Sequence, residues 1–529
     1  MDTKALRQKI LDLAIRGKLV PQDPNDEPAS VLLERIRAEK QQMAKDGKLK
    51  PKDIKNDTVI FKGDDNLHYE KFSDGTVKCI EDEIPFDVPA NWEWIRIKTA
   101  CVINPRNSID DNTEVSFVTM ANIKEGYANK FISDIRVWEK VKKGYTHFAD
   151  NDIGIAKITP CFENKKSVVF SGLINGYGAG TTELYIVRTI SSLVIPEYLL
   201  NFVKRDDFIA GGVLTFSGDV GQQRVTKDYV ANYLFTLPPL NEQQRILNAV
   251  HNANSLIESI EKSKDNLIRD IDKTKAKILD LAIRGKLVPQ DPNDEPASVL
   301  LERIRAEKEE LIRQDKIKRN KKESVIFKGS DNSYYEKIGN DIICIDDEIP
   351  FETPINWQWV RLGSTVRIER GGSPRPIKSY ITTDSNGINW IKIGDVDKDG
   401  KYITNTKEKI KPTGIKKSRE VYPGDFLLTN SMSFGRPYIS KIYGCVHDGW
   451  LVLRNPDVVF DINFLYYLLS SNYLYNQFVI KASGSTVDNL NIDKVSSALI
   501  CLPPLKEQTM IVNQIEKIIR LIQPFEELL

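Results

Sequence analysis

The chain has 529 residues, of which 41% are hydrophobic and 28% charged, and its formal net charge is only +1 at pH 7. This length exceeds what one hydrophobic core supports, so it predicts two or more domains. No apolar run reaches the roughly 18 residues of a membrane-spanning helix, and the charged first residues do not form a secretion signal; we expect a cytoplasmic protein. The six cysteines and four histidines are scattered, which argues against a disulfide framework and a metal site.

Positive charge is concentrated in one stretch of the chain. Between Lys401 and Arg419, seven Lys or Arg residues stand against a single acidic residue, Glu408. A local basic patch on a nearly neutral chain is typical of a selective nucleic-acid reader rather than of a non-specific coat. A solvated surface loop is the alternative interpretation.

An internal repeat organises the chain. Lys9–Lys40 is identical to Lys277–Lys308 over all 32 positions. Weaker matches follow between Thr58–Lys71 and Ser324–Lys337, between Cys79–Ile97 and Cys344–Leu362, and between Leu237–Ile246 and Leu502–Ile511. The stretches 98–236 and 363–501 do not match each other. A duplicated frame around divergent interiors predicts two similar modules that act on different targets; neutral drift after duplication is the alternative.

The first expected element is an N-terminal helix with an apolar stripe formed by Thr3, Leu6, Ile10 and Leu13. The prolines of LVPQDPNDEP then predict a bent, extended connector. Asp26, and Asp294 in the second copy, are expected to cap a shorter amphipathic helix. Its apolar positions in the first copy are Leu32, Leu33 and Ile36.

Each variable unit opens with the pattern IPF-x-x-P-x-N-W-x-W, which predicts an opening strand anchored by two tryptophans. These are Trp92 and Trp94, and then Trp357 and Trp359. Short strand-like runs such as IGIAKIT, SVVF, LYIVR, DFLLTN and WLVLR follow, separated by Gly, Asn, Asp and Pro turns. Short helices are expected at Pro196–Val203 and Ile462–Leu469. Each unit is therefore predicted to be a mixed α/β (α+β) domain of about 150 residues.

A long helix is expected between the two units. After Pro238-Pro239, apolar residues at alternating spacings of four and three predict a heptad helix that ends near Gly285. The stripe consists of Ile246, Val250, Ala253, Ile257, Ile260, Leu267, Ile271, Ile278 and Leu281. About 45 residues at 1.5 Å each would make a rod of roughly 65–70 Å.

The two ends of the chain carry the other half of this pattern. The C-terminal stripe consists of Ile511, Ile515, Ile518, Ile522, Phe525 and Leu529. Together with the N-terminal stripe it rebuilds almost the whole central helix. We therefore expect the terminal helices to lie end to end and antiparallel beside the central helix, in a cyclic arrangement with pseudo-two-fold symmetry. The expected segments are 1–84, 85–236, 237–349, 350–501 and 502–529, with the two variable units at 85–236 and 350–501.

Polar, turn-rich segments of the two units are the candidates for contact with DNA. Arg and Lys pair with guanine edges, Asn and Gln with adenine, and Ser, Thr or backbone N–H groups with phosphate. In the first unit the candidates are Thr159, Asn164, Lys165, Lys166, Thr181, Thr182, Ser217, Gln222, Gln223 and Arg224. In the second they are Arg370, Gly372, Ser373, Arg375, Asn430, Ser431, Ser433, Arg436, Ser483, Ser485 and Thr486. For each residue an ordinary turn role is the alternative.

Two LPPL-x-EQ helix starts, together with ILDLAIRGKLVPQ and KITPCFENKKS…GAGTTELY, resemble the specificity subunit of type I restriction–modification systems. The resemblance covers essentially the whole chain. It implies a non-catalytic, sequence-specific reader of a split, asymmetric site in double-stranded DNA. One recognition domain would read each half-site, and the helices would set the spacer.

The resemblance also implies partners. Two methylation subunits would dock on the repeated frame, and two restriction subunits that translocate DNA would join them. For this docking we predict Glu242, Gln243 and Ile246, with their equivalents Glu507, Gln508 and Ile511. No cofactor is expected on this chain, because S-adenosylmethionine, ATP and Mg²⁺ would bind to the partner subunits.

Three alternatives are considered. The chain could itself methylate or cut DNA, but it lacks both an Asn/Asp-Pro-Pro-Tyr/Phe tetrapeptide and a GxxxxGK[ST] phosphate loop. It could be a coiled-coil scaffold that does not bind DNA. It could also read DNA within a methylation-only defence assembly.

Overall fold

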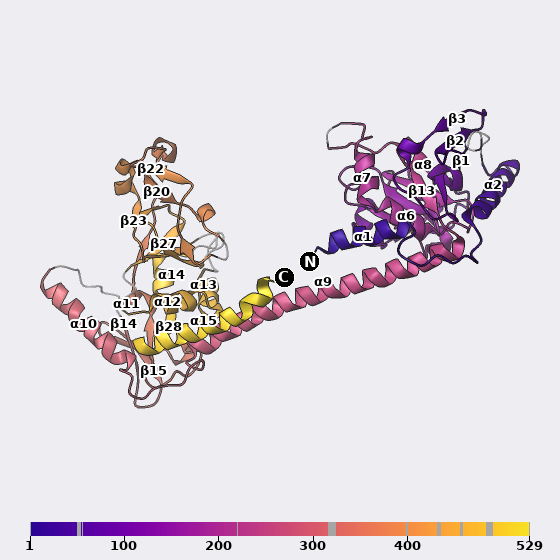
Figure 1. The fold of residues 1–529 in the computed structure, drawn as a ribbon. Coiled ribbons are helices and arrows are strands. Elements are labelled where there is room, and N and C mark those ends of the chain that lie inside the picture. Colours follow the sequence, from indigo (N-terminus) through magenta and orange to yellow (C-terminus); the bar gives the residue numbers. More distant parts are fainter. Residues whose placement is uncertain are drawn as a thin grey trace. The chain divides into compact units, whose positions relative to one another are not determined.

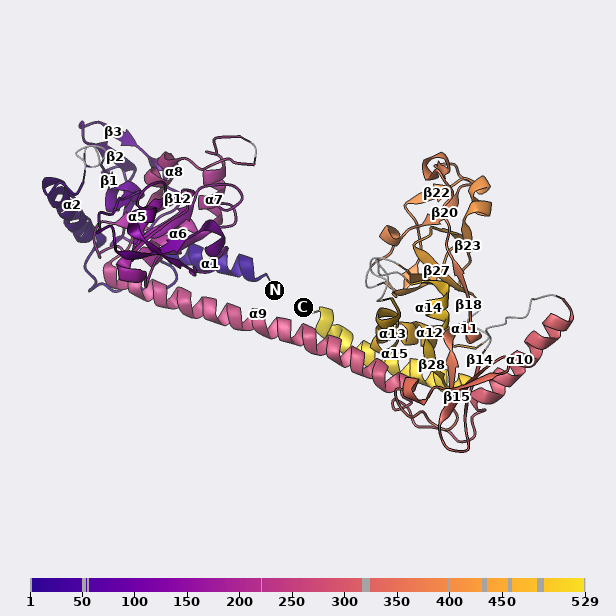
Figure 2. The same ribbon diagram turned by 180° about the vertical axis from the view of Figure 1, so that it is seen from behind.

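The computed structural model describes residues 2–49, 54, 57–219, 221–315, 324–397, 400–430, 435–454, 459–482, 490–527 and 529. The chain divides into two compact units, Met1–Ser263 and Lys264–Leu529, which are described one at a time. Figures 1 and 2 show both units from opposite sides. Within the described ranges, no helix has both the length and the apolarity needed to cross a membrane.

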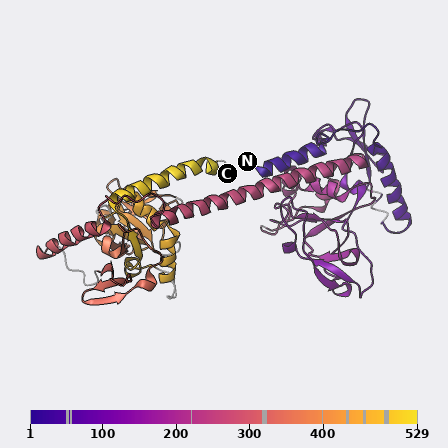
Figure 3. The same cartoon turned by 90° about the horizontal axis from the view of Figure 1, so that it is seen from below.

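The frame of the first unit is helical, with one small sheet. Its elements are α1 (Thr3–Ile15), α2 (Ala29–Lys45), β1 (Thr58–Lys62), β2 (His68–Phe72), β3 (Val77–Cys79) and the first part of α9 (Leu240–Ile283). The Asp2 side chain accepts a hydrogen bond from the Ala5 N–H and caps α1. Arg7 on α1 donates to Asn254 and Glu261 on α9, both at 2.9 Å, and α1 therefore lies antiparallel beside α9 (Figure 3).

The recognition domain of the first unit contains two four-stranded sheets, in the orders β10-β9-β12-β5 and β7-β6-β11-β8. Its strands are β4 (Glu93–Arg96), β5 (Cys101–Ile103), β6 (Glu114–Val118), β7 (Asp134–Val137), β8 (Thr146–Ala149), β9 (Ile153–Ala156), β10 (Ser167–Val169), β11 (Tyr177–Gly180), β12 (Leu184–Thr189) and β13 (Leu234–Leu237). Its helices are α4 (Ile97–Ala100), α5 (Trp138–Val141), α6 (Pro196–Val203), α7 (Asp206–Val213) and α8 (Lys227–Asn232). The opening strand β4 pairs antiparallel with the closing strand β13, so the domain begins and ends at one place.

The second unit repeats the frame around a different domain. The frame consists of the rest of α9, α10 (Ala297–Arg313), β14 (Ser324–Lys328), β15 (Tyr334–Ile338), β16 (Asp341–Cys344) and α15 (Leu505–Glu527). Lys275 and Lys264 on α9 donate to Glu526 and to the Leu529 carbonyl, and α15 thus lies antiparallel beside α9.

The second recognition domain contains two five-stranded sheets, in the orders β18-β27-β24-β25-β21 and β19-β22-β20-β26-β23. Its strands are β17 (Gln358–Arg361), β18 (Arg367–Arg370), β19 (Ile381–Thr382), β20 (Ile388–Ile391), β21 (Tyr402–Ile403), β22 (Glu408–Ile410), β23 (Arg419–Val421), β24 (Phe426–Thr429), β25 (Pro437–Ser440), β26 (Gly444–Val446), β27 (Trp450–Arg454) and β28 (Leu499–Leu502). Its helices are α11 (Leu362–Thr365), α12 (Ile462–Leu469), α13 (Asn472–Ala482) and α14 (Ile492–Ser496). Here β17 pairs with β28, as β4 pairs with β13 in the first unit.

Frame and domain share one hydrophobic core in each unit. In the first unit, Leu11 of α1 and Ile246 of α9 belong to the same buried cluster as Phe202 and Phe235 of the domain. In the second, Ile278 and Ile511 lie in one cluster with the strands and helices of the domain. Burial of this shared apolar surface holds each domain to its own frame helices.

Several predictions are confirmed. The helices Pro196–Val203 and Ile462–Leu469 have the predicted bounds, and α9 has 44 residues and begins directly after Pro238-Pro239. Two residues of the predicted apolar stripe of α9 are nevertheless partly exposed to solvent: Ile260 is 44% exposed and Leu267 is 39% exposed. The end-to-end meeting of the terminal helices stays a prediction.

The prediction that Asp26 and Asp294 cap the second helix is wrong. Pro28 and Pro296 occupy the N-cap positions of α2 and α10, and neither makes a side-chain cap. Asp26 instead accepts hydrogen bonds from Arg245 at 2.6 Å and Asn241 at 3.3 Å. Asp294 pairs with Lys506 at 2.9 Å. The fold brings a charged partner close to each carboxylate. A hydrogen bond to such a partner is stronger than one to a neutral backbone N–H group.

Candidate nucleic-acid interface

The EQ pair at the start of α9 ties the frame to the first recognition domain. Glu242 accepts hydrogen bonds from the Trp92 indole N–H at 2.9 Å and from Gln22 at 2.5 Å. Gln243 accepts from the Ile195 N–H at 2.9 Å and donates to the carbonyls of Leu193 and Pro238, at 3.0 and 3.1 Å. The connector, the opening strand and the loop before α6 therefore all meet at one helix start.

The second unit repeats this arrangement. Glu507 accepts from the Trp357 indole N–H at 2.9 Å and from Gln290 at 2.6 Å. Gln508 accepts from the Asp461 N–H at 2.8 Å and donates to the Val459 carbonyl at 3.1 Å. Burial raises the pKa of both Glu242 and Glu507, and the tryptophan hydrogen bonds oppose that rise.

These positions bear on the predicted partner-binding set, which stays a prediction. The six side chains, those of Glu242, Gln243, Ile246, Glu507, Gln508 and Ile511, are at most 2% exposed. Their hydrogen bonds and apolar contacts are made within the chain. A side chain buried in its own subunit offers little surface to another subunit.

Three separate segments of the first domain converge on one surface. The Thr159 N–H donates to the Gln223 carbonyl at 3.0 Å, and Ser217 and Arg224 exchange two backbone hydrogen bonds at 3.0 and 2.9 Å. Arg224 also donates to both carboxylate oxygens of Glu183, at 2.8 and 2.9 Å. The segments 159–166, 181–183, 217–219 and 221–224 thus form one polar cluster, although they lie far apart in the sequence.

The candidate side chains of this cluster differ in how firmly the protein already holds them. Arg224 is held bidentately by Glu183, an arrangement that fixes the loop. Lys165 pairs with Asp206 and donates to the Tyr127 hydroxyl at 3.1 Å. Lys166 donates to the Met120 carbonyl at 3.3 Å. The side chains with more exposure are those of Asn164, Thr182, Ser217 and Gln222, whereas Thr181 and Gln223 are half-buried.

In the second domain the candidates gather around Asp448. Ser373 donates to its carboxylate at 2.7 Å, and Arg375, whose side chain is 81% exposed, lies 3.5 Å from it. Asn430 is 1% exposed and donates to the Asp448 carbonyl at 2.9 Å. Asn430 is therefore a structural residue that shapes the loop rather than an exposed reader.

Close backbone packing defines the same loop. A Cβ atom on Gly371 would lie 2.0 Å from the His447 carbonyl oxygen, so only glycine fits. The Gly372 N–H donates to the Val446 carbonyl at 3.1 Å. Arg370 and Arg436 are exposed. The remaining candidates, Ser431, Ser433, Ser483, Ser485 and Thr486, lie outside the described residues.

The basic stretch Lys401–Arg419 lies against this loop. Arg419 donates to the Arg370 carbonyl at 3.3 Å, and Lys417 donates to the Tyr380 hydroxyl at 2.7 Å. Lys407, Lys411, Lys416, Lys417 and Arg419 are exposed. Lys401 is instead half-buried, with Tyr466 at 4.8 Å and Tyr467 at 5.2 Å from its ammonium. Five of the seven basic residues of the patch are therefore exposed, and its role in binding stays a prediction.

Sequence reasoning missed the acidic residues that order these loops. Asp448 lies in no quoted motif, and Glu183 lies in the GAGTTELY segment without having been selected as a site residue; their partners are 75 and 41 residues away, respectively. It also missed Leu214, which is 89% exposed beside the segment 217–219. The sequence around an isolated acidic or apolar residue contains no pattern that indicates its role. Only the residues that the fold places next to it do so.

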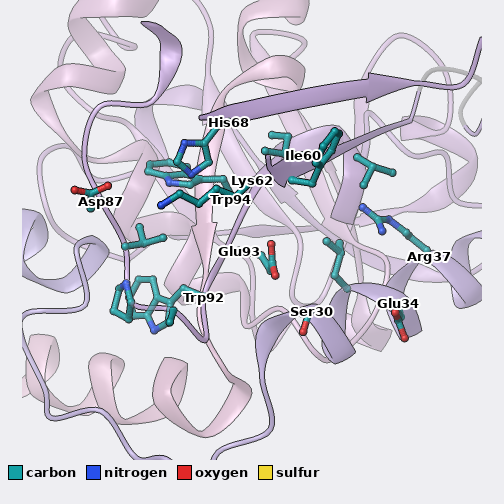
Figure 4. Close-up of a pocket in the computed structure, with 16 residues that line it drawn as sticks. Ser30, Glu34, Arg37, Ile60, Lys62, His68, Asp87, Trp92, Glu93 and Trp94 are labelled. Carbon is teal, nitrogen blue, oxygen red and sulfur yellow. The ribbon is translucent and has the colours of Figure 1, made fainter. Parts of the chain in front are cut away.

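A cavity of about 520 Å³ lies between the frame of the first unit and the opening segment of its domain, and none of its lining residues belongs to the polar cluster. Figure 4 shows Glu34 and Arg37 of α2, Lys62 of β1 and Trp94 of the opening strand around it. Burial lowers the pKa of Arg37 and raises that of the neighbouring Glu93. Within the described ranges, no group of three or more His, Cys, Asp or Glu residues could hold a metal ion.

The chain is similar to known proteins over its length. The family model for the "Type I restriction modification DNA specificity domain" matches residues 354–527. The chain is 34% identical to the type I restriction enzyme EcoEI specificity subunit of Escherichia coli, over 97% of this chain and 88% of that protein. It is 38% identical to the EcoAI specificity subunit of the same species, over 70% of this chain and 63% of that protein.

The fold has a counterpart among solved structures. One chain, from work on complex assembly and conformational transition of the type I R-M system, superposes with a TM-score of 0.56. The match covers 84% of this chain and 94% of that chain at 19% identity, a likeness of fold alone. Two mixed α/β domains, each with a helical frame and both joined by the long helix α9, agree with the predicted fold class. The 34% identity across nearly the whole chain shows that this protein belongs to the family of type I restriction–modification specificity subunits.

Proposed function

We propose that this chain is the non-catalytic subunit that reads a split, asymmetric DNA site in the cytoplasm, with one recognition domain on each half-site. The observation that carries this proposal is one frame built twice around two different domains. The frame is identical over 32 residues and uses the same EQ hydrogen bonds in both units. The domains differ, with four-stranded sheets in the first and five-stranded sheets in the second.

The recognition domains are proposed to span 85–236 and 350–501. The pairing of β4 with β13, and of β17 with β28, supports these limits, because each domain starts and ends on one two-stranded sheet. Such a domain is exchangeable as a block, since its two ends leave the frame side by side.

The helices of the frame are proposed to set the unread spacer and to carry the partners: two methylation subunits and two restriction subunits that translocate DNA. S-adenosylmethionine, ATP and Mg²⁺ would bind to those subunits. Because the EQ side chains are buried, we propose that the partners dock on exposed positions of the frame. Lys9, Glu34 and Arg35 are examples, because they lie in the identical segment and are exposed in both units.

Direct contact with DNA is proposed for the exposed members of each candidate set. In the first domain these are Asn164, Thr182, Ser217 and Gln222, and in the second they are Arg370, Arg375 and Arg436. Amide and guanidinium groups read base edges in the major groove, and hydroxyl groups bind phosphate.

A domain exchange tests the proposal. Residues 85–236 are replaced by the first recognition domain of a family member with a different target, and methylated adenines are mapped across the genome of cells that carry the whole system. We expect one half-site to change while the other half-site and the spacer stay the same. The matched exchange of 350–501 should change the opposite half. A change in both halves after one exchange would contradict the two-reader assignment.

A further inference from the structure

Helix α1 makes polar contacts with the recognition domain of its own unit through Gln8. The Gln8 amide donates to the Tyr127 hydroxyl at 2.8 Å and to the Lys204 carbonyl at 3.2 Å, and its oxygen accepts from the Asp206 N–H at 2.9 Å. The neighbouring Arg7 is anchored on α9 by Asn254 and Glu261. A single frame residue therefore reaches both the start of α7 and the loop that contains Tyr127.

Lys204 connects that loop to the proposed DNA-contacting loop. Its ammonium group, on a residue only 3% exposed, donates to the carbonyls of Gly126, Ala128 and Lys165, at 2.6, 3.1 and 3.3 Å. An ammonium has three donors, and here all three find an acceptor. Gly126 also donates its N–H to the Asn164 carbonyl at 2.9 Å. The buried Lys204 side chain thus joins the loops around residues 126 and 164 through hydrogen bonds to their backbone carbonyls.

The second unit has no glutamine at the position that matches Gln8. The position that matches Gln8 is Ala276, one residue before the identical segment Lys277–Lys308 begins. Ala276 has no side-chain group that donates or accepts a hydrogen bond. It lines a cavity of about 580 Å³ together with Asn472 and Asn476 of α13. The duplicated frame therefore differs at the place where α1 meets the first domain.

We infer that Gln8 and Lys204 are positioning residues for DNA reading by the first recognition domain. They set the loops 124–130 and 161–166 at a fixed place relative to the frame, without themselves touching DNA. The inference rests on the proposed function, because it takes the loop around Asn164 to face DNA. It makes the N-terminal helix part of the reading apparatus of the first half-site and of that half-site only.

The test uses the full chain, assembled with the methylation subunits of its own system. The complex methylates a DNA library in which both half-sites are randomised, and sequencing gives the preference at each position. The variants are Gln8→Ala, Lys204→Met and Lys204→Arg. Lys4→Ala serves as a matched control, because Lys4 is an exposed residue of the same helix. Asn164→Ala tests the loop itself.

We expect Gln8→Ala and Lys204→Met to lower the preference for the correct first half-site about five- to tenfold, roughly the effect of losing one base contact. The second half-site should not change, and Lys4→Ala should match the unaltered chain. Lys204→Arg keeps the charge and several N–H donors, so it should retain most of the preference. A residue needed only for stability would reduce overall methylation and leave both half-site preferences as they were.

Two results would overturn the inference. If Asn164→Ala alters the first half-site while Gln8→Ala and Lys204→Met do not, the loop reads DNA but is not positioned by these residues. If none of the three alters it, the proposed contact by this loop fails, and the inference fails with it. If Lys204→Met prevents folding, Gln8→Ala decides, because it removes only a half-buried side chain at the helix surface.

Discussion

Replacing Trp92 with phenylalanine isolates the hydrogen bond that joins the opening strand to α9. Trp92 is 4% exposed, and its indole N–H donates to Glu242, which is fully buried, at 2.9 Å. Phenylalanine keeps an aromatic ring in the core but has no donor. The Glu242 carboxylate would retain only the hydrogen bond from Gln22.

The expected cost follows from the charge and burial of the acceptor. A hydrogen bond to a charged group contributes about 1.5–3 kcal/mol to the free energy of unfolding. For a domain of this size each kcal/mol shifts the melting temperature by about 2–4 °C. Trp92→Phe should therefore lower the melting temperature of the first unit by about 3–12 °C, with an added loss from the smaller ring.

Trp94→Phe is the matched control. Trp94 is also 4% exposed, but its indole nitrogen has no hydrogen-bond partner among the described residues. Both variants lose the same ring atoms, so the difference between them measures the hydrogen bond to Glu242. Thermal unfolding of the purified chain, followed by far-ultraviolet circular dichroism, gives the melting temperature of each variant. If Trp94→Phe costs as much as Trp92→Phe, the hydrogen bond to Glu242 does not stabilise the unit and the reasoning fails.

Two further predictions concern charge. Burial raises the pKa of Glu242 above its value in the unfolded chain. Between about pH 4.5 and that raised pKa, the carboxyl group ionises in the unfolded chain but stays protonated in the folded one. The free energy of unfolding should therefore fall as the pH rises through this range. In Glu242→Gln this fall should become smaller but not vanish, because burial also raises the pKa of Glu93 and Glu507; urea unfolding at pH 4.5, 5.5 and 7 measures it, and an unchanged pH dependence would contradict the assignment. In the basic patch, neutralising Lys416, Lys417 and Arg419 to Gln should weaken DNA binding equally for all sequences and reduce the slope of log affinity against log salt by about 1 per phosphate contact. A changed base preference with an unchanged slope would show base contact instead.

Local pattern was enough for the helices and for the plan of the chain. Pro196–Val203 has proline at its first position and a helical apolar period, both properties of neighbouring residues, and its bounds are correct. The 32-residue identity and the repeated LPPL-x-EQ starts establish the duplication and the resemblance to the family without any structure. The opening strand is correct as well, although β4 begins only at Glu93.

What each polar side chain does depended on partners far along the chain. Asp26 is of a residue type that commonly caps helices, but it pairs with Arg245, 219 residues away. Glu242 and Gln243 occupy the first turn of a long helix, where exposure is the local expectation, yet Trp92 and the loop before α6 cover them. Arg224, a predicted DNA-contacting residue, donates its guanidinium hydrogen bonds to Glu183, 41 residues away.

Repetition and periodicity in the amino-acid sequence were therefore sufficient to predict two frames and two variable domains, and the repeated motifs were sufficient to indicate the family. Packing in three dimensions decided which residues of those frames are exposed, and it showed that α1 joins the first domain through Gln8 whereas the second copy has Ala276 at that position. The physical reason is that helical periods and capping depend on residues a few positions apart, whereas burial and hydrogen bonding depend on whichever residues the fold brings together.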